Sequence, residues 1–136
     1  EPHGVAVDTN GKIYVADAVA GTLTTYTADG TPTSPTISGL SGPLGVAVDA
    51  HGKIYIAQSV GGEVTTYTAD GTPTTPTISV TAVGVAVNPA NGKIYVTDGY
   101  ERVYTYKANG ARINPTIVPQ FGSGAIALYW PKYSMP

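Results

Sequence analysis

The sequence predicts an all-β fold, a β-propeller segment of three four-stranded antiparallel blades plus one extra strand. Three observations predict it. A stretch that begins Gly-Val-Ala-Val recurs at Gly4, Gly45 and Gly84, which are 41 and 39 residues apart. Each copy holds four runs of strand-forming residues separated by Gly-containing turns. No segment has sustained 3.6-residue periodicity with caps, so we expect no helix. A fixed period of about 40 residues is typical of repeated blades.

The four strands of the first copy are expected at 5–7, 12–16, 22–27 and 33–38. Asp8 and Gly11 bound the first turn, because Asp favours the start of a type I turn and Gly tolerates positive φ. The Asp29-Gly30 pair marks the hairpin between the third and fourth strands. Short turns between consecutive strands predict a meander.

The second strand has apolar side chains on both faces. Ile13 and Val15 point one way, and Tyr14 and Ala16 point the other. In a sheet with one solvent-exposed face, apolar and polar residues would instead alternate along each strand. Each sheet is therefore expected to be covered on both sides by neighbouring sheets, as a propeller blade is.

The fourth strand carries a proline in every copy: Pro35, Pro76 and Pro115. Proline cannot donate a hydrogen bond to a ladder, so this strand belongs at a sheet edge. Proline at an edge also discourages pairing with other chains. The fourth strand is therefore expected to be the outermost strand of each blade.

Residues 1–136 are expected to form a single partial propeller domain, with blades at about 2–40, 43–80 and 83–119 and an extra strand at about 124–129. Three blades do not close a ring, since propellers usually have four to eight. The bare end faces would be covered by further copies of the chain or by missing propeller blades. Two copies would close a ring, and strand addition would instead make a filament. Candidate assembly residues are Ile126, Leu128 and Trp130.

Composition excludes several classes of function. Charged residues make up 12% of the chain, the net charge is −2, and the seven Lys and Arg form no run. A nucleic-acid partner is therefore not expected. No apolar run approaches the roughly 18 residues that span a membrane. There are no cysteines, which excludes disulfides and thiolate metal sites. The first residue is Glu rather than Met. Low charge and high Thr content favour a secreted or cell-surface protein with a cleaved signal.

The repeated pattern Pro-x-Gly-Val-Ala-Val-Asp-x-x-Gly-x-Ile-Tyr-Val-Ala-Asp resembles the NHL repeat and the related blades of virginiamycin B lyase-like and gluconolactonase-like propellers. The residues that carry it are 2–17, 43–58 and 84–98, and the resemblance extends over about nine-tenths of the chain. Arg102-Val103 also matches the Arg-Val that often opens the third strand of an NHL repeat, where the first two copies differ. The resemblance implies a propeller that typically has six blades. Its motif residues are structural, so it predicts the fold better than the function.

Candidate binding residues lie in the loops on one face of the expected disc. The resemblance to the lyase-like proteins, which use a histidine in catalysis, draws attention to His3, although its counterparts are Leu44 and Val83. Gluconolactonase-like enzymes bind a divalent metal near the axis, and Asp17, Gln58 and Asp98 occupy one repeat position there. A strand-end Asp more often caps its own turn. Tyr100, Glu101 and Arg102 break the repeat and are a candidate specific contact.

The sequence predicts no catalytic residue, no metal site and no cofactor. We expect a non-catalytic propeller module that acts in protein binding or self-assembly, with copies of itself, missing blades or another protein as partner. One alternative is a lyase-like or lactonase-like metal-dependent enzyme whose site is completed by a second copy or by missing sequence. A second alternative is a carbohydrate-binding propeller.

Overall fold

The computed structural model describes residues 1–100 and 102–118, which form strands and no helix, and therefore no helix long and apolar enough to cross a membrane. The strands pair into three sheets, β1-β2-β3-β4, β5-β6-β7-β8 and β9-β10-β11-β12, which we call blades 1, 2 and 3. The bounds are β1 Pro2–Val7, β2 Ile13–Asp17, β3 Thr22–Tyr26, β4 Pro32–Ile37, β5 Pro43–Val48, β6 Ile54–Gln58, β7 Glu63–Tyr67, β8 Pro73–Ser79, β9 Gly84–Val87, β10 Ile94–Thr97, β11 Val103–Tyr106 and β12 Arg112–Ile117.

All neighbouring strands within a blade are antiparallel, so each blade is a meander. The all-β propeller segment predicted from the sequence is confirmed, and its proline-bearing strands β4, β8 and β12 lie at the outer edges. The extra strand expected at about 124–129 lies outside the described residues.

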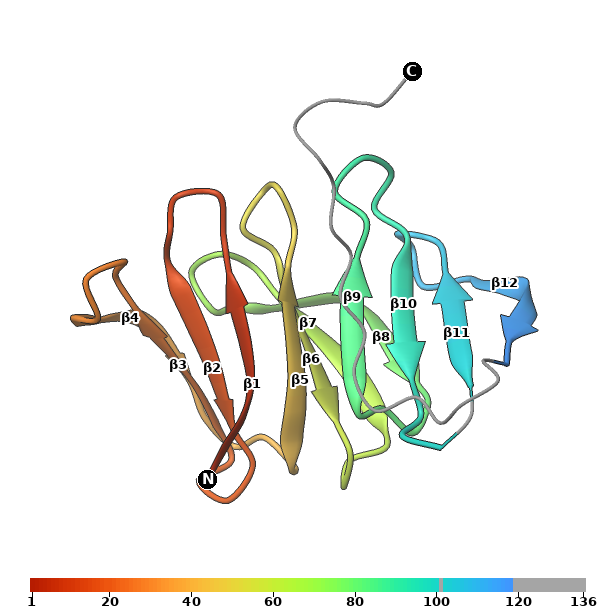
Figure 1. Cartoon of the computed structure of the whole chain (residues 1–136), viewed down its shortest axis with the longest axis horizontal. Coiled ribbons are helices and arrows are strands. Elements are labelled where there is room, and N and C mark those ends of the chain that lie inside the picture. Colours follow the sequence, from red (N-terminus) through yellow and green to blue (C-terminus); the bar gives the residue numbers. More distant parts are fainter. Residues whose placement is uncertain (101, 119–136) are drawn as a thin grey trace.

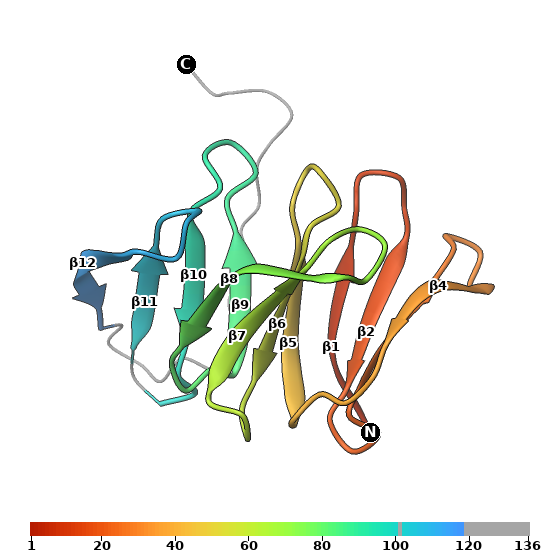
Figure 2. The same cartoon turned by 180° about the vertical axis from the view of Figure 1, so that it is seen from behind.

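The blades stand side by side with their first strands together, β1 beside β5 and β5 beside β9 (Figure 1). The outer strands β4 and β12 lie at opposite ends of the row, as the reverse view also shows (Figure 2). The turns that join the first two strands of each blade share one edge, the upper edge in Figure 1. The loops between the second and third strands share the opposite edge, so equivalent loops of different blades line up.

The carboxylate of Asp8 stabilises the first turn of blade 1. Asp8 Oδ1 accepts hydrogen bonds from the backbone N–H groups of Asn10 (2.8 Å) and Lys12 (3.0 Å). The N–H of Gly11 donates to the Asp8 carbonyl at 3.0 Å, with Gly11 at φ 81°. The same arrangement recurs around Asp49 in blade 2. The Asp residues assigned to turns from the sequence therefore do form them.

The outer strand of each blade contains a register shift beside its proline. In blade 1 the pairing moves from Leu23↔Ile37 to Thr25↔Thr33, and the bond before Pro35 is cis. The hydroxyl of Thr25 donates to the carbonyl groups of Thr33 (3.1 Å) and Pro35 (2.8 Å). Thr25 is buried. Its one hydroxyl proton therefore lies between two backbone acceptors of the outer strand, where the register shift interrupts the ladder.

The core lies between blades rather than within one. Each blade has a forward face, which contacts the next blade in the chain, and a back face on its other side. The forward face of blade 1 carries Ala6, Tyr14, Ala16, Leu23 and Ile37, and it packs on the back face of blade 2, which carries Val46, Val48, Ile54, Ile56 and Tyr67. The forward face of blade 2 packs in the same way on the back face of blade 3. Both faces of a middle blade are thus covered, which explains the apolar residues on both sides of its strands.

Candidate functional site

The predicted ligand residues of blade 1 lie at the ends of β1 and β2. His3 is exposed, and its Nε2 lies 3.7 Å from a carboxylate oxygen of Glu1. Asp17 Oδ1 accepts hydrogen bonds from the backbone N–H of Ala20 (2.8 Å) and from the amino group of Glu1 (2.5 Å). These bonds, that of Ala20 first, lower the pKa of Asp17. This carboxylate closes the β2–β3 loop.

Gln58 occupies the equivalent position in blade 2 and is buried. Its Oε1 accepts a hydrogen bond from the N–H of Ser41 at 2.6 Å, and its Nε2 donates to the hydroxyl of Thr65 at 2.8 Å. Both ends of the amide are therefore used to tie the loop before β5 to blade 2. This side chain is a structural bridge.

Asp98 occupies the same position in blade 3 and is nearly buried. Its Oδ1 accepts hydrogen bonds from the N–H groups of Tyr100 (2.9 Å) and Arg102 (3.2 Å), and its Oδ2 accepts one from the Tyr104 hydroxyl at 3.4 Å. Tyr100 and Arg102 are exposed, and Glu101 lies outside the described residues. The carboxylate holds the loop that presents Tyr100.

The three strand-end residues thus lie on the same edge, but Asp17 and Asp98 accept hydrogen bonds in their own loops and Gln58 bridges Ser41 and Thr65. Among residues 1–100 and 102–118, no three His, Cys, Asp or Glu side chains gather so that they could hold a metal ion. The predicted assembly residues Ile126, Leu128 and Trp130 lie outside the described residues. The described ligand candidates therefore form no common chemical centre.

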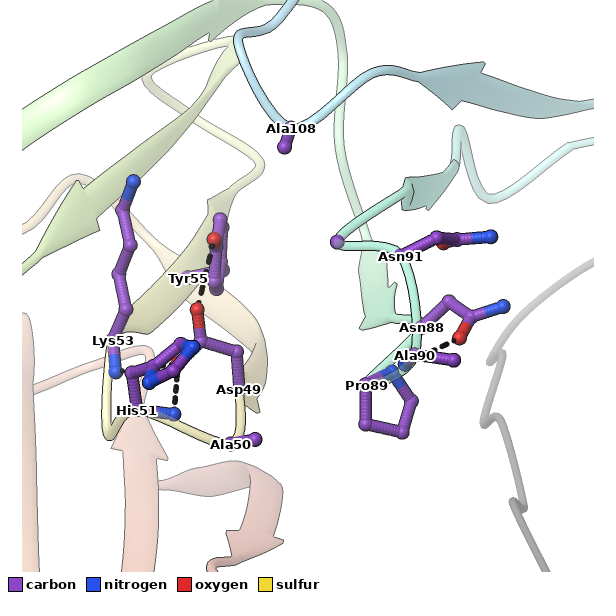
Figure 3. A pocket seen from close by; sticks show the side chains of 11 residues that line it. Asp49, Ala50, His51, Lys53, Tyr55, Asn88, Pro89, Ala90, Asn91 and Ala108 are labelled. Atoms are coloured by element: carbon purple, nitrogen blue, oxygen red, sulfur yellow. Dashed lines mark hydrogen bonds between the residues drawn. The ribbon is translucent and has the colours of Figure 1, made fainter.

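On the opposite edge, a groove of about 370 Å³ lies between the first turns of blades 2 and 3 (Figure 3). Asp49 forms one wall, with Oδ1 bonded to the N–H of His51 (2.8 Å) and Oδ2 accepting from the Tyr55 hydroxyl (3.4 Å). Burial, with the charge of Asp49 and this hydrogen bond, raises the pKa of Tyr55 to about 12. The side-chain amides of Asn88 and Asn91 point away from that wall (Figure 3). The Asp49 carboxylate therefore accepts hydrogen bonds from the turn backbone and from the Tyr55 hydroxyl.

The lysine that follows each first turn is also used structurally. Lys12 Nζ donates to the carbonyl of Ser34 in β4 and lies 5.5 Å from the ring centroid of Tyr14. Lys53 repeats both contacts in blade 2, with the Thr75 carbonyl and the Tyr55 ring. These lysines connect the first turn to the outer strand. They are not a free basic patch.

The most unusual surface is the back face of blade 1. Val5 and Val7 of β1 are 67% and 60% exposed, whereas the counterparts of Val5, Val46 in blade 2 and Val85 in blade 3, are 7% and 4% exposed. Those counterparts are buried because a preceding blade covers them. No blade of the described residues covers the back face of blade 1, so the same apolar pattern meets solvent there.

The outer rim, where the last two strands of each blade turn, shows the same difference between blade 1 and the other two blades. A Cβ placed on Gly71 would lie 2.7 Å from the Cβ of Pro35, and one on Gly110 would lie 2.6 Å from the Cβ of Pro76. The turn between the last two strands of one blade is therefore packed against the proline of the preceding blade. At the equivalent Gly30, nothing lies within 4 Å of such a Cβ. The turn at Gly30 therefore leaves open the space that the proline of the preceding blade occupies at Gly71 and Gly110. We call this open space the vacant seat at Gly30.

Blade 3 presents the opposite half of this contact. Ile117 is 47% exposed, whereas the equivalent Ile37 and Ile78 are 7% and 4% exposed. Pro115 is exposed, while Pro35 and Pro76 are buried. The rim of blade 3 therefore carries a proline and an isoleucine that, in blades 1 and 2, are buried against the following blade.

Comparison with known proteins agrees with this repeat geometry. The family model of the NHL repeat matches residues 1–23, which hold β1, β2 and the start of β3. No curated protein sequence matches the chain. Among solved structures, a streptogramin B lyase superposes with a TM-score of 0.75 at 17% identity, over 93% of this chain and 44% of the other. The chain is an NHL-repeat-like β-propeller segment.

Two further structures share this fold. A gluconolactonase from Xanthomonas campestris gives a TM-score of 0.68 at 19% identity, over 91% of the NHL-like segment and 49% of the enzyme. A chain of a nidogen/laminin complex gives 0.69 at 23% identity, over 86% and 47%. The NHL-like segment spans less than half of each of these proteins. At these identities the similarity shows the fold alone.

One further set of exposed apolar residues recurs in the NHL-like segment. Val19, Val60 and Tyr100 each lie two residues after the strand-end position, and they are 77%, 80% and 74% exposed. Sequence reasoning singled out Tyr100 but missed its two counterparts. It also expected bare end faces without naming Val5 or Val7. Aligning the copies would have shown both sets, because the equivalent residues share a position in the repeat.

Proposed function

We propose that this NHL-like segment is a non-catalytic protein-binding module that receives a further propeller blade on the back face of blade 1. The observation that carries the proposal is the exposure of Val5 and Val7, since the counterparts of Val5 are buried in blades 2 and 3 and those of Val7 are partly buried in blade 2 and buried in blade 3. Fully burying a valine side chain contributes about 1.5–3 kcal/mol. The ligand for this face is thus a surface like the forward face of blade 1.

The vacant seat at Gly30 supports a blade rather than another kind of partner. At both internal junctions this seat is filled by the proline of the preceding blade. A helix or a loop would cover the valines without supplying a proline at the rim. A blade supplies both contacts at once, with the geometry that the chain already uses between its own blades.

A non-catalytic role is supported by the hydrogen bonds that the candidate polar residues already make. Asp17, Gln58, Asp98 and Asp49 are each hydrogen-bonded within a loop or turn. Isothermal calorimetry with Mn²⁺ and Ca²⁺, combined with a screen of lactone and ester substrates, tests this part. We expect no turnover that depends on the added metal, and metal-dependent turnover would favour the lyase-like or lactonase-like alternative.

A secreted or cell-surface location belongs to the same proposal. The low charge and the Thr-rich outer strands support it. Fold similarity to a chain of a nidogen/laminin complex is compatible with a protein partner. Cell fractionation of the source organism with an antibody to the chain tests the location, and a purely cytoplasmic signal would contradict it.

The blade-binding part is tested by supplying the blade in the same polypeptide. A second copy of residues 43–83, which holds blade 2 and its native connection to the next blade, is fused ahead of Gly4. If the face accepts a blade, Val5→Asp with Val7→Asp lowers the free energy of unfolding of this fusion by several kcal/mol, because the charges become buried.

The same two substitutions in the parent chain, studied at a dilution where it is a single copy, change stability by no more than about 0.5 kcal/mol. Urea unfolding measures both effects. A matched control places aspartates at Thr31 and Ser38, which are exposed on the outer rim. Equal effects of the Val5/Val7 pair in the parent and the fusion would show that the added blade does not seat on this face, and the proposal would then fail.

A further inference from the structure

Two grooves of the same construction lie on the edge that carries the first turns. Groove 2–3 is the groove of about 370 Å³ described above, between blades 2 and 3, and groove 1–2, of about 330 Å³, lies between blades 1 and 2. They are neighbours, because Asp49, Ala50 and His51 line both. Their volumes are at the lower end of the range for small-molecule sites. A ligand that fills either groove is therefore a small molecule.

The preceding blade supplies equivalent residues to each groove. In both, the aspartate of the first turn accepts a hydrogen bond from a tyrosine hydroxyl, and the lysine donates to a carbonyl of the outer strand. These residues are Asp8, Lys12 and Tyr14 in groove 1–2, and Asp49, Lys53 and Tyr55 in groove 2–3. This wall has one lysine and one carboxylate in either groove, so it does not distinguish them.

The following blade supplies a different charge to each groove. It contributes Asp49 to groove 1–2 and, at the equivalent position, the neutral Asn88 to groove 2–3. The turn between its last two strands lines groove 1–2 with Ala69 and groove 2–3 with Ala108. The residues on either side of that alanine are Thr68 and Asp70 in blade 2, and Lys107 and Asn109 in blade 3. Blade 3 therefore replaces two carboxylates of blade 2 by amides and adds a lysine.

Arg112 adds a further cation on the side of blade 3 that faces blade 2. It pairs with Tyr106, at the position that Pro73 has in blade 2. Its guanidinium lies 4.5 Å from the ring centroid of Tyr104, which packs against the apolar cluster between the two blades. Arg112 and Lys107 are both exposed. Their charges are therefore open to a ligand.

The last turn of blade 3 lies near Lys53. The Lys53 ammonium donates to the carbonyl of Thr75. The turn packs on the next residue, since a Cβ placed on Gly110 would lie 2.6 Å from the Cβ of Pro76. Figure 3 shows the ammonium toward the Ala108 end of the groove. An ammonium has three N–H donors, so Lys53 keeps donors for a ligand at that end.

We propose that groove 2–3 binds a small organic anion with two negative charges, carried by carboxylate or phosphate groups, through Lys53, Lys107 and Arg112. Three cations stand there against one carboxylate, which attracts an anion. In groove 1–2 the balance is reversed, because one lysine stands against three carboxylates, those of Asp8, Asp49 and Asp70. This site goes beyond the proposed function and does not depend on the back face of blade 1.

Carboxylate and phosphate ligands are distinguished by isothermal calorimetry. Digalacturonate supplies two carboxylates on sugar rings, glucose 6-phosphate supplies a phosphate, and glucose is the neutral control. At about 0.01 M salt we expect one site per chain for at least one of the two anions and none for glucose. Raising the salt to about 1 M should abolish the binding, because the screening length falls from about 30 Å to about 3 Å.

Two matched pairs of substitutions locate the site. Lys107→Gln with Arg112→Gln should weaken the binding about tenfold or more, because two cations beside the ligand are lost. Lys12→Gln with Arg102→Gln removes the same two side-chain types from elsewhere and gives the same net charge, so the affinity should change less than about twofold. Cooperative urea unfolding confirms that each variant is folded.

A third variant uses residues that the chain already accommodates. Lys107→Thr with Asn109→Asp gives blade 3 the turn residues of blade 2, where the Thr68 hydroxyl donates to the Asp70 carboxylate. We expect the same loss of about tenfold or more. Failure of both anions to bind, equal binding of glucose, or an equal loss in the two matched pairs would overturn the inference.

Discussion

At the residue scale, hydroxyl and carboxylate groups bind the backbone of their own blade. Thr25 and Thr66 donate to the carbonyl groups beside the outer-strand prolines, and Asp8 and Asp49 accept from turn N–H groups. Among the described residues, no buried side-chain nitrogen or oxygen lacks a hydrogen-bond partner. The described Thr and Asp side chains thus complete the irregular strands and the turns of their blades.

Thr25→Val tests this role, because valine keeps the shape and removes the donor. The carbonyl groups of Thr33 and Pro35 would lose the hydroxyl that now satisfies them. We expect the free energy of unfolding, measured in urea, to fall by about 1–3 kcal/mol. Thr24→Val, on the half-buried back face one residue earlier, is the matched control. It should be nearly neutral when both variants also carry Val5→Asp and Val7→Asp, which keep that face free of a further blade. Equal effects would contradict the bond's importance.

Tyr14 makes stability depend on alkaline pH. Burial, with the hydrogen bond and charge of Asp8, raises its pKa from 10.0 to about 12. Above pH 10 the unfolded chain loses the phenolic proton while the folded chain keeps it. The stabilisation is therefore complete below pH 10 and is lost as the pH rises from 10 through 12.

Tyr14→Phe removes this titration together with the bond to Asp8. At pH 7 we expect the free energy of unfolding to fall by about 1 kcal/mol. Between pH 10 and 12 the variant should lose stability less steeply than the wild type. Tyr26→Phe is the control, because the Tyr26 hydroxyl makes no hydrogen bond within the described residues. An unchanged slope in Tyr14→Phe would show that Tyr14 does not carry the pH dependence.

At the element scale, much of each blade follows from local sequence. Alternating apolar residues set the strand faces, Asp and Gly set the turns, and Pro35 marks the outer strand. The register shift beside Pro35 and the seating of Pro35 against Gly71 were not predicted. Both depend on contacts between residues far apart in the chain, for which the repeat pattern of one blade carries no signal.

Alanine substitutions at Gly71 and Gly30 distinguish the free-energy cost of a strained turn from the cost of a disturbed contact between two blades. Both have strongly positive φ, 87° and 86°, so alanine at either position costs roughly 1–2 kcal/mol. Only Gly71 faces a proline, whose Cβ lies 2.7 Å from the added methyl position. We therefore expect Gly71→Ala to lower the free energy of unfolding by about 1–3 kcal/mol more than Gly30→Ala.

The comparison is made with Val5→Asp and Val7→Asp also present, so that the back face of blade 1 stays uncovered in both proteins. Chemical unfolding of the two proteins gives the difference directly. If the glycine substitutions cost the same, the rim contact between blades would contribute nothing, and the argument for a vacant seat at Gly30 would lose its basis.

At the scale of the whole molecule, the sequence predicted bare faces at both ends of the row of blades, and the structure exposes that of blade 1. On blade 3 the rim is exposed, whereas Ala86, Thr97 and Val103 of the forward face are buried. Val5 and Val46 have the same neighbours along the chain, and their exposures of 67% and 7% differ only because a blade covers one of them. The strand-end residues chosen as ligands share a position in the repeat, yet Asp17 and Asp98 bond within their own loops while Gln58 bonds Ser41 and Thr65. Repetition places equivalent residues along one edge without making them converge.

A further copy of the chain that covers the back face of blade 1 would couple folding to concentration. A ligand that binds only the folded state stabilises it by an amount that grows with the ligand's concentration, and here the ligand is another copy of the chain. The melting temperature of the wild type should therefore rise steadily as the protein is concentrated. With Val5→Asp and Val7→Asp the midpoint should be independent of concentration, and it should match that of the wild type at high dilution. Differential scanning calorimetry over a hundredfold range of concentration measures this. A wild-type midpoint that does not move would mean that no further copy covers the apolar back face of blade 1 in the native protein.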